Sequence, residues 1–238
     1  MQGLPLNIPK ETEEFIRRNL YLLESQERIQ ISAMAQGELP LAKEHFACVL
    51  ARSVAASIFL RLDREVPADQ TQMKVRCHAI HIALLNGVAA IENLIDRCLY
   101  PQAATLLRQQ VEGLCNLYAL RTAIFKVRRP PRTAILKRMK LMKAYVHLTE
   151  LSHLTHPDFL YEIQGVNGER MTSPFNESLS KFLLGLHAIS LHWLGAEIAW
   201  LRPFASDRYQ SEEEEGYSAI VMGILIDVGF VSGSPTTA

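Results

Sequence analysis

An arginine and a glutamate lie one helical turn apart in an otherwise apolar segment, YPQAATLLRQQVEGLCNLYAL (residues 100–120). A guanidinium can bind a phosphate or a carboxylate, and a carboxylate can pair with that cation or move a proton. At about 100° per residue, Arg108 and Glu112 share one arc of the helix with other polar side chains. We call this set the polar stripe: Thr105, Arg108, Gln109, Glu112 and Asn116.

Two surroundings fit the polar stripe. The rest of this helix is apolar over most of its circumference, which is typical of a central helix that contacts neighbours on several sides. The stripe can therefore be a narrow solvated seam, which we favour, or it can face an internal polar cleft where Arg108 and Glu112 pair with groups from other helices. The absence of lysine from the stripe supports the cleft, because lysine is typical of freely solvated faces and arginine of fixed hydrogen-bond geometry.

The same region resembles a known family. NGVAAIENLIDRCLYPQAATLLRQQVEGLCNLYAL (86–120) is similar to the core of a family of uncharacterised bacterial all-helical proteins with an arginine-x-x-x-glutamate helix, and LSHLTHPD (151–158) is similar to its serine-and-histidine stretch. Members are loosely grouped with HEPN-like domains, several of which cut RNA. The resemblance implies that Arg108, Glu112, Ser152 and His156 lie near one another, with Arg108, Glu112 and His156 lining the site if the protein is an enzyme.

HEPN ribonucleases place a histidine four to six residues after an arginine, because cleavage needs a cation at the phosphate and an imidazole to move a proton. Arg76 and His81 in RCHAIH have this spacing. A motif this loose is expected about once or twice by chance in a chain so rich in arginine and histidine. Five residues of helix also turn the two side chains about 140° apart. We therefore hold Arg76 and His81 only as a further possibility beside the Arg108 site.

The densest group of metal-ligating residue types lies in HLTELSHLTHPD (147–158). One helix cannot direct His147, Glu150 and His153 at a single ion, because they lie on different faces. His153 shares a face with Ile135, Met142 and Val146, which predicts a histidine of the core. His156 precedes a proline and is typical of a helix end. We predict no metal site and no cofactor.

Charge is segregated along the chain. Residues 113–149 hold nine basic residues and no acid, whereas residues 150–238 hold twelve acids and four basic residues. Lysines at 137, 140 and 143 fall on one arc of a continuous helix, and this basic stripe could bind phosphates. The set that we assign to phosphate binding is Arg132, Lys137, Lys140 and Lys143. We favour the alternative that the stripe is simply solvated, or meets the acidic C-terminal part within the fold or across a dimer.

These residues must be positioned by helices. Apolar residues recur at spacings of three and four nearly throughout, and alternating strand patterns are missing. The pattern predicts an all-α, single-domain bundle of about seven helices over residues 1–230 with a disordered tail at 231–238. Prolines, glycines and capping residues bound the expected helices at about 10–37, 40–64, 71–99, 100–127, 132–154, 177–201 and 211–230.

Composition limits the function further. The chain has 48% hydrophobic and 21% charged residues, its four cysteines form no C-x-x-C pair, and no signal peptide or membrane-length apolar run is evident. We expect a cytosolic protein without a membrane association. Our leading hypothesis is an interaction or regulatory protein with an electropositive surface around residues 121–143, which self-associates as a homodimer and takes RNA or an acidic protein as partner. The alternative is a HEPN-like ribonuclease or nucleotide-handling enzyme.

Overall fold

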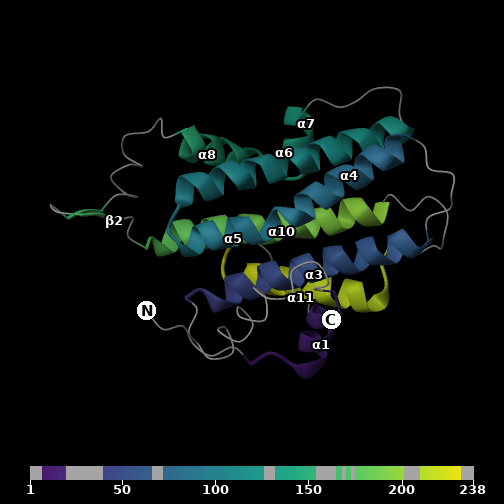
Figure 1. Ribbon diagram of the computed structural model, residues 1–238, viewed down its shortest axis with the longest axis horizontal. Helices are drawn as coiled ribbons and strands as arrows, with labels where there is room; N and C mark the ends of the chain where they lie inside the picture. Colours follow the sequence, from purple (N-terminus) through teal and green to yellow (C-terminus); the bar gives the residue numbers. More distant parts are fainter. Residues whose placement is uncertain are drawn as a thin grey trace. The chain divides into compact units, whose positions relative to one another are not determined.

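The computed structural model describes residues 7–19, 40–65, 72–125, 132–153, 165–167, 170–172, 175–200 and 210–231. The described residues are overwhelmingly helical, which confirms the prediction of an all-α bundle (Figure 1). The helices are α1 (Lys10–Asn19), α3 (Ala42–Glu65), α4 (Gln72–Asn86), α5 (Val88–Asp96), α6 (Tyr100–Phe125), α7 (Arg132–Arg138), α8 (Met142–His153), α10 (Glu177–Trp200) and α11 (Glu212–Asp227).

The chain divides into two compact units. One unit comprises residues 1–70 and 188–238, and the other comprises residues 71–187, so the division falls within α10. The prediction of a single domain therefore stays a prediction. Of the predicted tail, only Val231 lies within the described residues.

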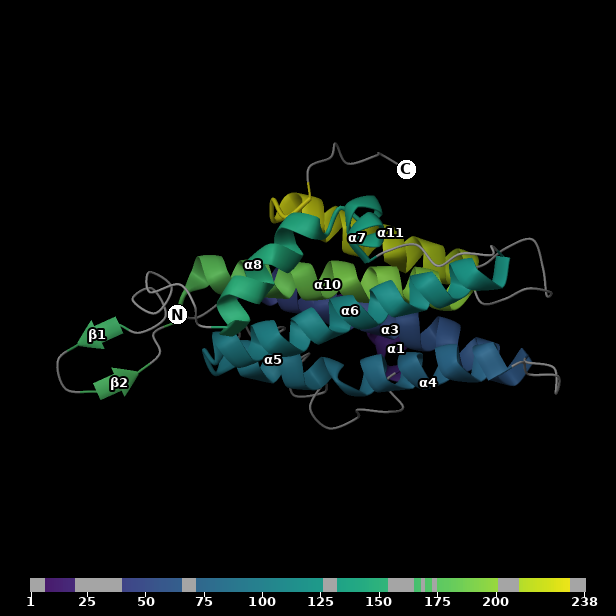
Figure 2. The ribbon, with the colours of Figure 1, turned by 90° about the horizontal axis from the view of Figure 1, so that it is seen from above.

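In the unit of residues 71–187, α6 is the central helix. It packs against α4, α5, α7 and α8 (Figure 2), as the apolar circumference of its sequence predicts. Leu107, Val111 and Leu114 of α6 are at most 1% exposed, as are Leu148 and Leu151 of α8. Gly113 lies where α6 meets α4, and a Cβ atom there would come within 2.7 Å of Leu84 Cδ2.

Two of the predicted helices are each divided into two. The expected helix at 71–99 is interrupted at Gly87, between α4 and α5. The expected helix at 132–154 ends at Arg138, because Lys140 adopts a left-handed φ of 56°. Leu141 N donates to Leu136 O at 2.9 Å and Lys140 N to Lys137 O at 3.1 Å, which is the Schellman pattern of a helix end. The buried pair Leu136 and Leu141 completes that motif.

In the unit of residues 1–70 and 188–238, α3 packs against α1 and α11. Ser211 and Glu214, which have the spacing of a capping box, form one at the start of α11, since they exchange side-chain and backbone hydrogen bonds. The Glu214 carboxylate is buried and also accepts from Ser57 Oγ at 2.9 Å and from Arg61 Nη2 at 2.6 Å. This carboxylate therefore links α11 to α3.

The sequence predicts no helix or strand between the expected helices at 132–154 and 177–201, and this was wrong for six residues of that connection. Strands β1 (Gly165–Asn167) and β2 (Arg170–Thr172) pair there as an antiparallel hairpin. At the end of this connection, Asn176 Oδ1 accepts from Leu179 N at 2.9 Å and so caps α10. Asn176 N donates to the buried Tyr100 hydroxyl at 2.8 Å, which fixes the start of α10 against α6.

Two segments, Val75–Asp96 and Glu177–Ala199, are long and apolar enough to span a bilayer by length and composition. Most of the second is buried within the protein, as in the core helices of water-soluble proteins, which have the same character. The absence of a membrane association and the cytosolic location therefore stay predictions.

Candidate functional site

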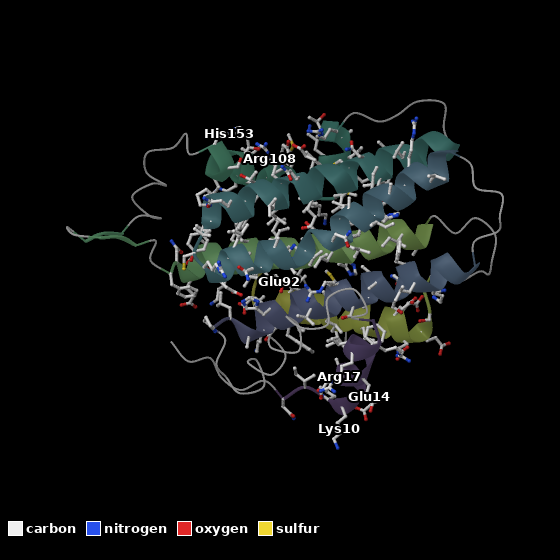
Figure 3. All side chains as sticks on the ribbon, viewed as in Figure 1. Lys10, Glu14, Arg17, Glu92, Arg108 and His153 are labelled. Atoms are coloured by element: carbon white, nitrogen blue, oxygen red, sulfur yellow. The ribbon has the colours of Figure 1, made fainter. Side chains whose placement is uncertain are left out.

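The polar stripe of α6 faces α8, and Arg108 is its centre. Arg108 Nη1 donates to Ser152 Oγ at 3.2 Å and lies 2.8 Å from His153 Nε2 (Figure 3). An arginine has no hydrogen-bond acceptor, so His153 Nε2 must accept and the imidazole proton lies on Nδ1. Arg108 Nε is 3.9 Å from Glu112 Oε1. Arg108 thus connects the carboxylate of its own helix to the last turn of α8.

Glu112 is the acceptor on which the neighbouring donors converge. The Tyr145 hydroxyl of α8 donates to Glu112 Oε1 at 2.6 Å, and Arg132 Nη1 of α7 lies 3.2 Å from the same oxygen. Arg132 Nη1 also donates to the Tyr145 hydroxyl at 3.4 Å. One carboxylate oxygen therefore joins α6, α7 and α8. We call Arg108, Glu112, Arg132, Tyr145, Ser152 and His153 the α6–α8 polar network.

The burial of Arg108 and Glu112 is intermediate between that expected for a solvated seam and that expected for an internal cleft. The side chains of Arg108 and Glu112 are 23% and 28% exposed, whereas Gln109 and Asn116 are exposed to solvent. One edge of the stripe is therefore a solvated seam, and the other edge pairs with groups of neighbouring helices. The network is open to solvent on one side.

The electrostatics of the network follow from these contacts. The hydrogen bond to Glu112 raises the pKa of Tyr145, with burial adding to the effect, so this hydroxyl stays protonated and able to donate. The bond to Tyr145 raises the pKa of Arg132. Burial raises the pKa of the neighbouring Cys115 thiol to about 11, with Arg132 opposing and Glu112 adding to that shift. A thiol with this pKa is protonated at neutral pH and is a poor nucleophile.

The prediction that His153 belongs to the core was wrong. His153 is exposed and bonded to Arg108, and Val146 of the same predicted face is 46% exposed. The error comes from the left-handed residue Lys140, because a helix that ends and restarts does not keep its rotational phase. Ile135 faces the core from α7, whereas α8 buries Leu148 and Leu151.

The break at Lys140 also corrects the predicted basic stripe. The three lysines do not lie along one continuous helix: Lys137 belongs to the last turn of α7, Lys140 to the joint, and Lys143 to the first turn of α8. All three are exposed, and within the described parts of the chain they form no ion pair or hydrogen bond. Arg132, the fourth member of the predicted phosphate set, is engaged by Glu112 and Tyr145.

The acidic C-terminal helix α11 has basic partners of its own. Glu213 pairs with Arg18 at 2.7 Å, Glu214 with Arg61 at 2.6 Å, and Asp227 with Lys43 at 2.6 Å. These three basic partners lie in the same unit as α11, and the alternative that the lysines at 137, 140 and 143 meet the acidic part stays a prediction.

The other candidates of the sequence do not assemble a site. Arg76 is exposed while His81 is 1% exposed, so these two side chains have different surroundings. His147 lies 3.7 Å from Glu150 and stacks edge-on against Phe182. Over the residues that can be described, no group of three or more potential metal ligands is found. His156 lies outside the described residues, as do Lys126, Arg128 and Arg129 of the electropositive segment.

A second polar group is enclosed in the same unit. His187 Nδ1 of α10 lies 2.8 Å from Gln110 Oε1 of α6, and His187 Nε2 lies 3.6 Å from Glu92 Oε1 of α5. Glu92 and His187 are fully buried and Gln110 is 3% exposed. Because an amide oxygen only accepts, His187 donates from Nδ1. The group binds three helices together and is closed to solvent.

Sequence reasoning missed Tyr145 as a member of the α6–α8 polar network. A tyrosine in a helix is usually a core residue with a polar tip, and its spacing from Glu112 carries no motif. Scans against protein-family models and searches of curated proteins and of solved structures found no match to this chain.

Proposed function

We propose that this protein is an interaction protein that binds the phosphate backbone of RNA through Lys137, Lys140 and Lys143, which we call the basic surface. The observation that carries the proposal is that these three lysines are exposed within seven residues of chain and have no acidic partner among the described residues. Exposed ammonium groups without a counter-charge release condensed counterions when they meet a polyphosphate, which is the main source of sequence-independent affinity.

The side chains around the basic surface suit contacts with phosphates rather than stacking on bases. Tyr145 is the aromatic residue of α7 and α8, and its hydroxyl is held by Glu112 in a half-buried position. Tyr118 of α6 is 8% exposed, and the Arg138 guanidinium lies 5.4 Å from its ring centre. Binding to single strands relies on exposed aromatic rings that stack on bases. We therefore take an RNA duplex as the ligand.

The test is a salt series of gel shifts on a short RNA duplex. Three phosphate contacts predict a log–log slope of affinity against salt of about −2.7. Changing Lys137, Lys140 and Lys143 to glutamine should abolish binding at physiological salt and leave helicity unchanged, because lysine and glutamine have similar helix propensities.

The matched control changes three exposed lysines on other helices, Lys10, Lys43 and Lys181, to glutamine. This control loses the same charge and should keep most of the affinity and a slope closer to that of the wild type. Equal loss in both triple variants would mean that net charge alone drives binding. Absence of duplex binding by the wild type at low salt would refute the proposal.

A second candidate function rests on the 2.8 Å approach of Arg108 Nη1 to His153 Nε2. A cation beside an exposed imidazole is the pairing that metal-independent phosphodiester cleavage needs, with His153 moving a proton and Arg108 stabilising charge on the phosphate. This is the HEPN-like ribonuclease alternative, with His153 added to Arg108, Glu112 and His156. Purified protein should then cleave mixed RNA in the presence of a chelator, and His153→Ala or His156→Ala should abolish cleavage at unchanged melting temperature. Intact RNA over a range of pH would exclude it.

A further inference from the structure

Arg132 is the basic residue of the proposed phosphate set that already has an anionic partner. Its Nη1 atom lies 3.2 Å from Glu112 Oε1 and 3.4 Å from the Tyr145 hydroxyl. The side chain is nevertheless 47% exposed, so part of the guanidinium is open to solvent. A cation held by a half-exposed carboxylate can exchange that partner for another anion, because an exposed ion pair is stabilised only weakly.

Glu112 Oε1, the oxygen that contacts Arg132, has further donors around it. Glu112 Oε1 accepts from Tyr145 at 2.6 Å, faces Arg132 at 3.2 Å and has Arg108 Nε at 3.9 Å. Two guanidinium groups and one hydroxyl thus converge on a single carboxylate oxygen. The same donors would suit one oxygen of a phosphate, since phosphate and carboxylate oxygens accept arginine donors in similar geometry.

The charges around Glu112 indicate what the loss of its own charge would do. Two arginines face one carboxylate, so the network keeps a surplus positive charge with Glu112 in place. Arg132 opens α7, the helix that carries Lys137 in its last turn, so it belongs to the same short segment as the basic surface. Loss of the Glu112 charge would therefore add a cation to that surface.

We propose that Glu112 is an internal counter-anion that occupies the phosphate position of Arg132, so that Arg132 is withheld from RNA until the Glu112 contact is broken. This inference rests on the proposed RNA binding and specifies how that binding is regulated. Removal of the half-buried Glu112 carboxylate should therefore strengthen RNA binding and add one phosphate contact.

The experiment compares Glu112→Gln with the wild type in the same duplex salt series. Glutamine keeps the size of the side chain and an oxygen that accepts from Tyr145, but it loses the charge that holds Arg132. One additional contact should steepen the slope by about 0.9, so that the affinity ratio between about 50 and about 200 mM salt grows about 3.5-fold. Arg132→Gln should have little effect in the wild type and should cancel the gain in the Glu112→Gln background, a coupling that a double-mutant cycle measures.

Glu150→Gln is the matched control. Glu150 lies on α8 with a side chain 43% exposed, and its carboxylate lies 3.7 Å from His147 Nδ1 rather than against an arginine. Its neutralisation removes the same charge but frees no arginine, so the slope should stay at the wild-type value. A slope change of equal size in Glu150→Gln and Glu112→Gln would overturn the inference.

Each remaining outcome is decisive. If the wild type binds through the three lysines and Glu112→Gln leaves the slope unchanged, the inference fails and the proposed function stands. If neither protein binds the duplex, both fail. Glu112→Asn provides a second variant in case Glu112→Gln unfolds, because it also removes the charge that holds Arg132; a steepening of the slope is expected, and none would count against the inference.

Discussion

Glu112 has the largest structural role of the polar stripe. Its carboxylate connects three helices through Tyr145, Arg132 and Arg108, and its side chain is 28% exposed. Hydrogen bonds to a charged group of this burial typically contribute about 1.5 kcal/mol or more, whereas exposed pairs contribute about 0.5 kcal/mol or less.

Glu112→Ala should therefore lower the free energy of unfolding by about 1.5 kcal/mol. Glu150→Ala, whose carboxylate is 43% exposed beside His147, should lower it by less than about 0.5 kcal/mol. Urea midpoints of the three proteins at neutral pH provide the measurement. Equal midpoints for Glu112→Ala and the wild type would mean that the stripe is only a solvated seam.

Titration of the Cys115 thiol should make the free energy of unfolding depend on pH in the alkaline range. Burial raises the pKa of its thiol from about 9 to about 11 in the folded protein. The folded state therefore holds this proton more tightly than the unfolded chain, so the resulting stability is fully present below about pH 9 and is lost as the pH rises through 11.

Cys115→Ala removes this titration. Its urea midpoint should be lower than that of the wild type at pH 7, because a small cavity remains. Between pH 9 and pH 11 its midpoint should decline less steeply than that of the wild type. Parallel pH curves for the two proteins would contradict the raised pKa.

At the scale of elements, the joint between α7 and α8 determines which side chains meet α6. Lys140 adopts a left-handed φ of 56° that costs a residue with a Cβ atom about 1 kcal/mol, a cost that glycine does not have. Lys140→Gly should therefore raise the urea midpoint relative to Lys140→Ala, which loses the same charge and keeps the strain. The reverse order would contradict the helix end at this position.

Close packing of α6 on α4 depends on Gly113. A Cβ atom at this position would lie 2.7 Å from Leu84 Cδ2 and 3.3 Å from Leu84 Cγ, so the end of the leucine side chain would have to shift. Gly113→Ala should cost about 1 kcal/mol. Gly223→Ala in α11 is the control, because a Cβ atom there meets nothing within 4 Å and alanine should stabilise the helix by about 0.5 to 1 kcal/mol. Denaturant midpoints that shift in the same direction would contradict this contrast.

At the scale of the whole molecule, segregated charge within a net charge of zero favours self-association. Opposite charges on two copies attract at low salt and are screened beyond about 10 Å at 0.1 M salt. The mass measured by light scattering should therefore exceed the monomer value of 26.9 kDa at low ionic strength and fall as salt is added.

The variant with Lys137, Lys140 and Lys143 changed to glutamine should show a weaker salt dependence of that mass. A mass above the monomer value that does not change with salt would indicate an apolar dimer contact instead. A monomer at every salt concentration would refute the predicted homodimer.

The sequence by itself determined the helical class, most helix ends and the central place of α6. These features follow from local causes: Pro9 and Pro101 begin helices, Ser211 and Glu214 form a capping box, and apolar spacing defines the buried faces. Proximity of Arg108 to Ser152 was implied by resemblance to a family, and the 3.2 Å hydrogen bond brings these two side chains together. Their role in catalysis stays a prediction.

Only the tertiary structure decided what the polar stripe contacts. Tyr145 and Arg132 reach Glu112 from helices that no spacing rule connects to α6, and the buried group of Glu92, Gln110 and His187 joins residues far apart in the chain. The rotational phase of α8 was also beyond the sequence, because lysine at position 140 gives no signal for a left-handed turn. That conformation is stable there because burial of Leu136 and Leu141 and the paired backbone hydrogen bonds outweigh its local cost.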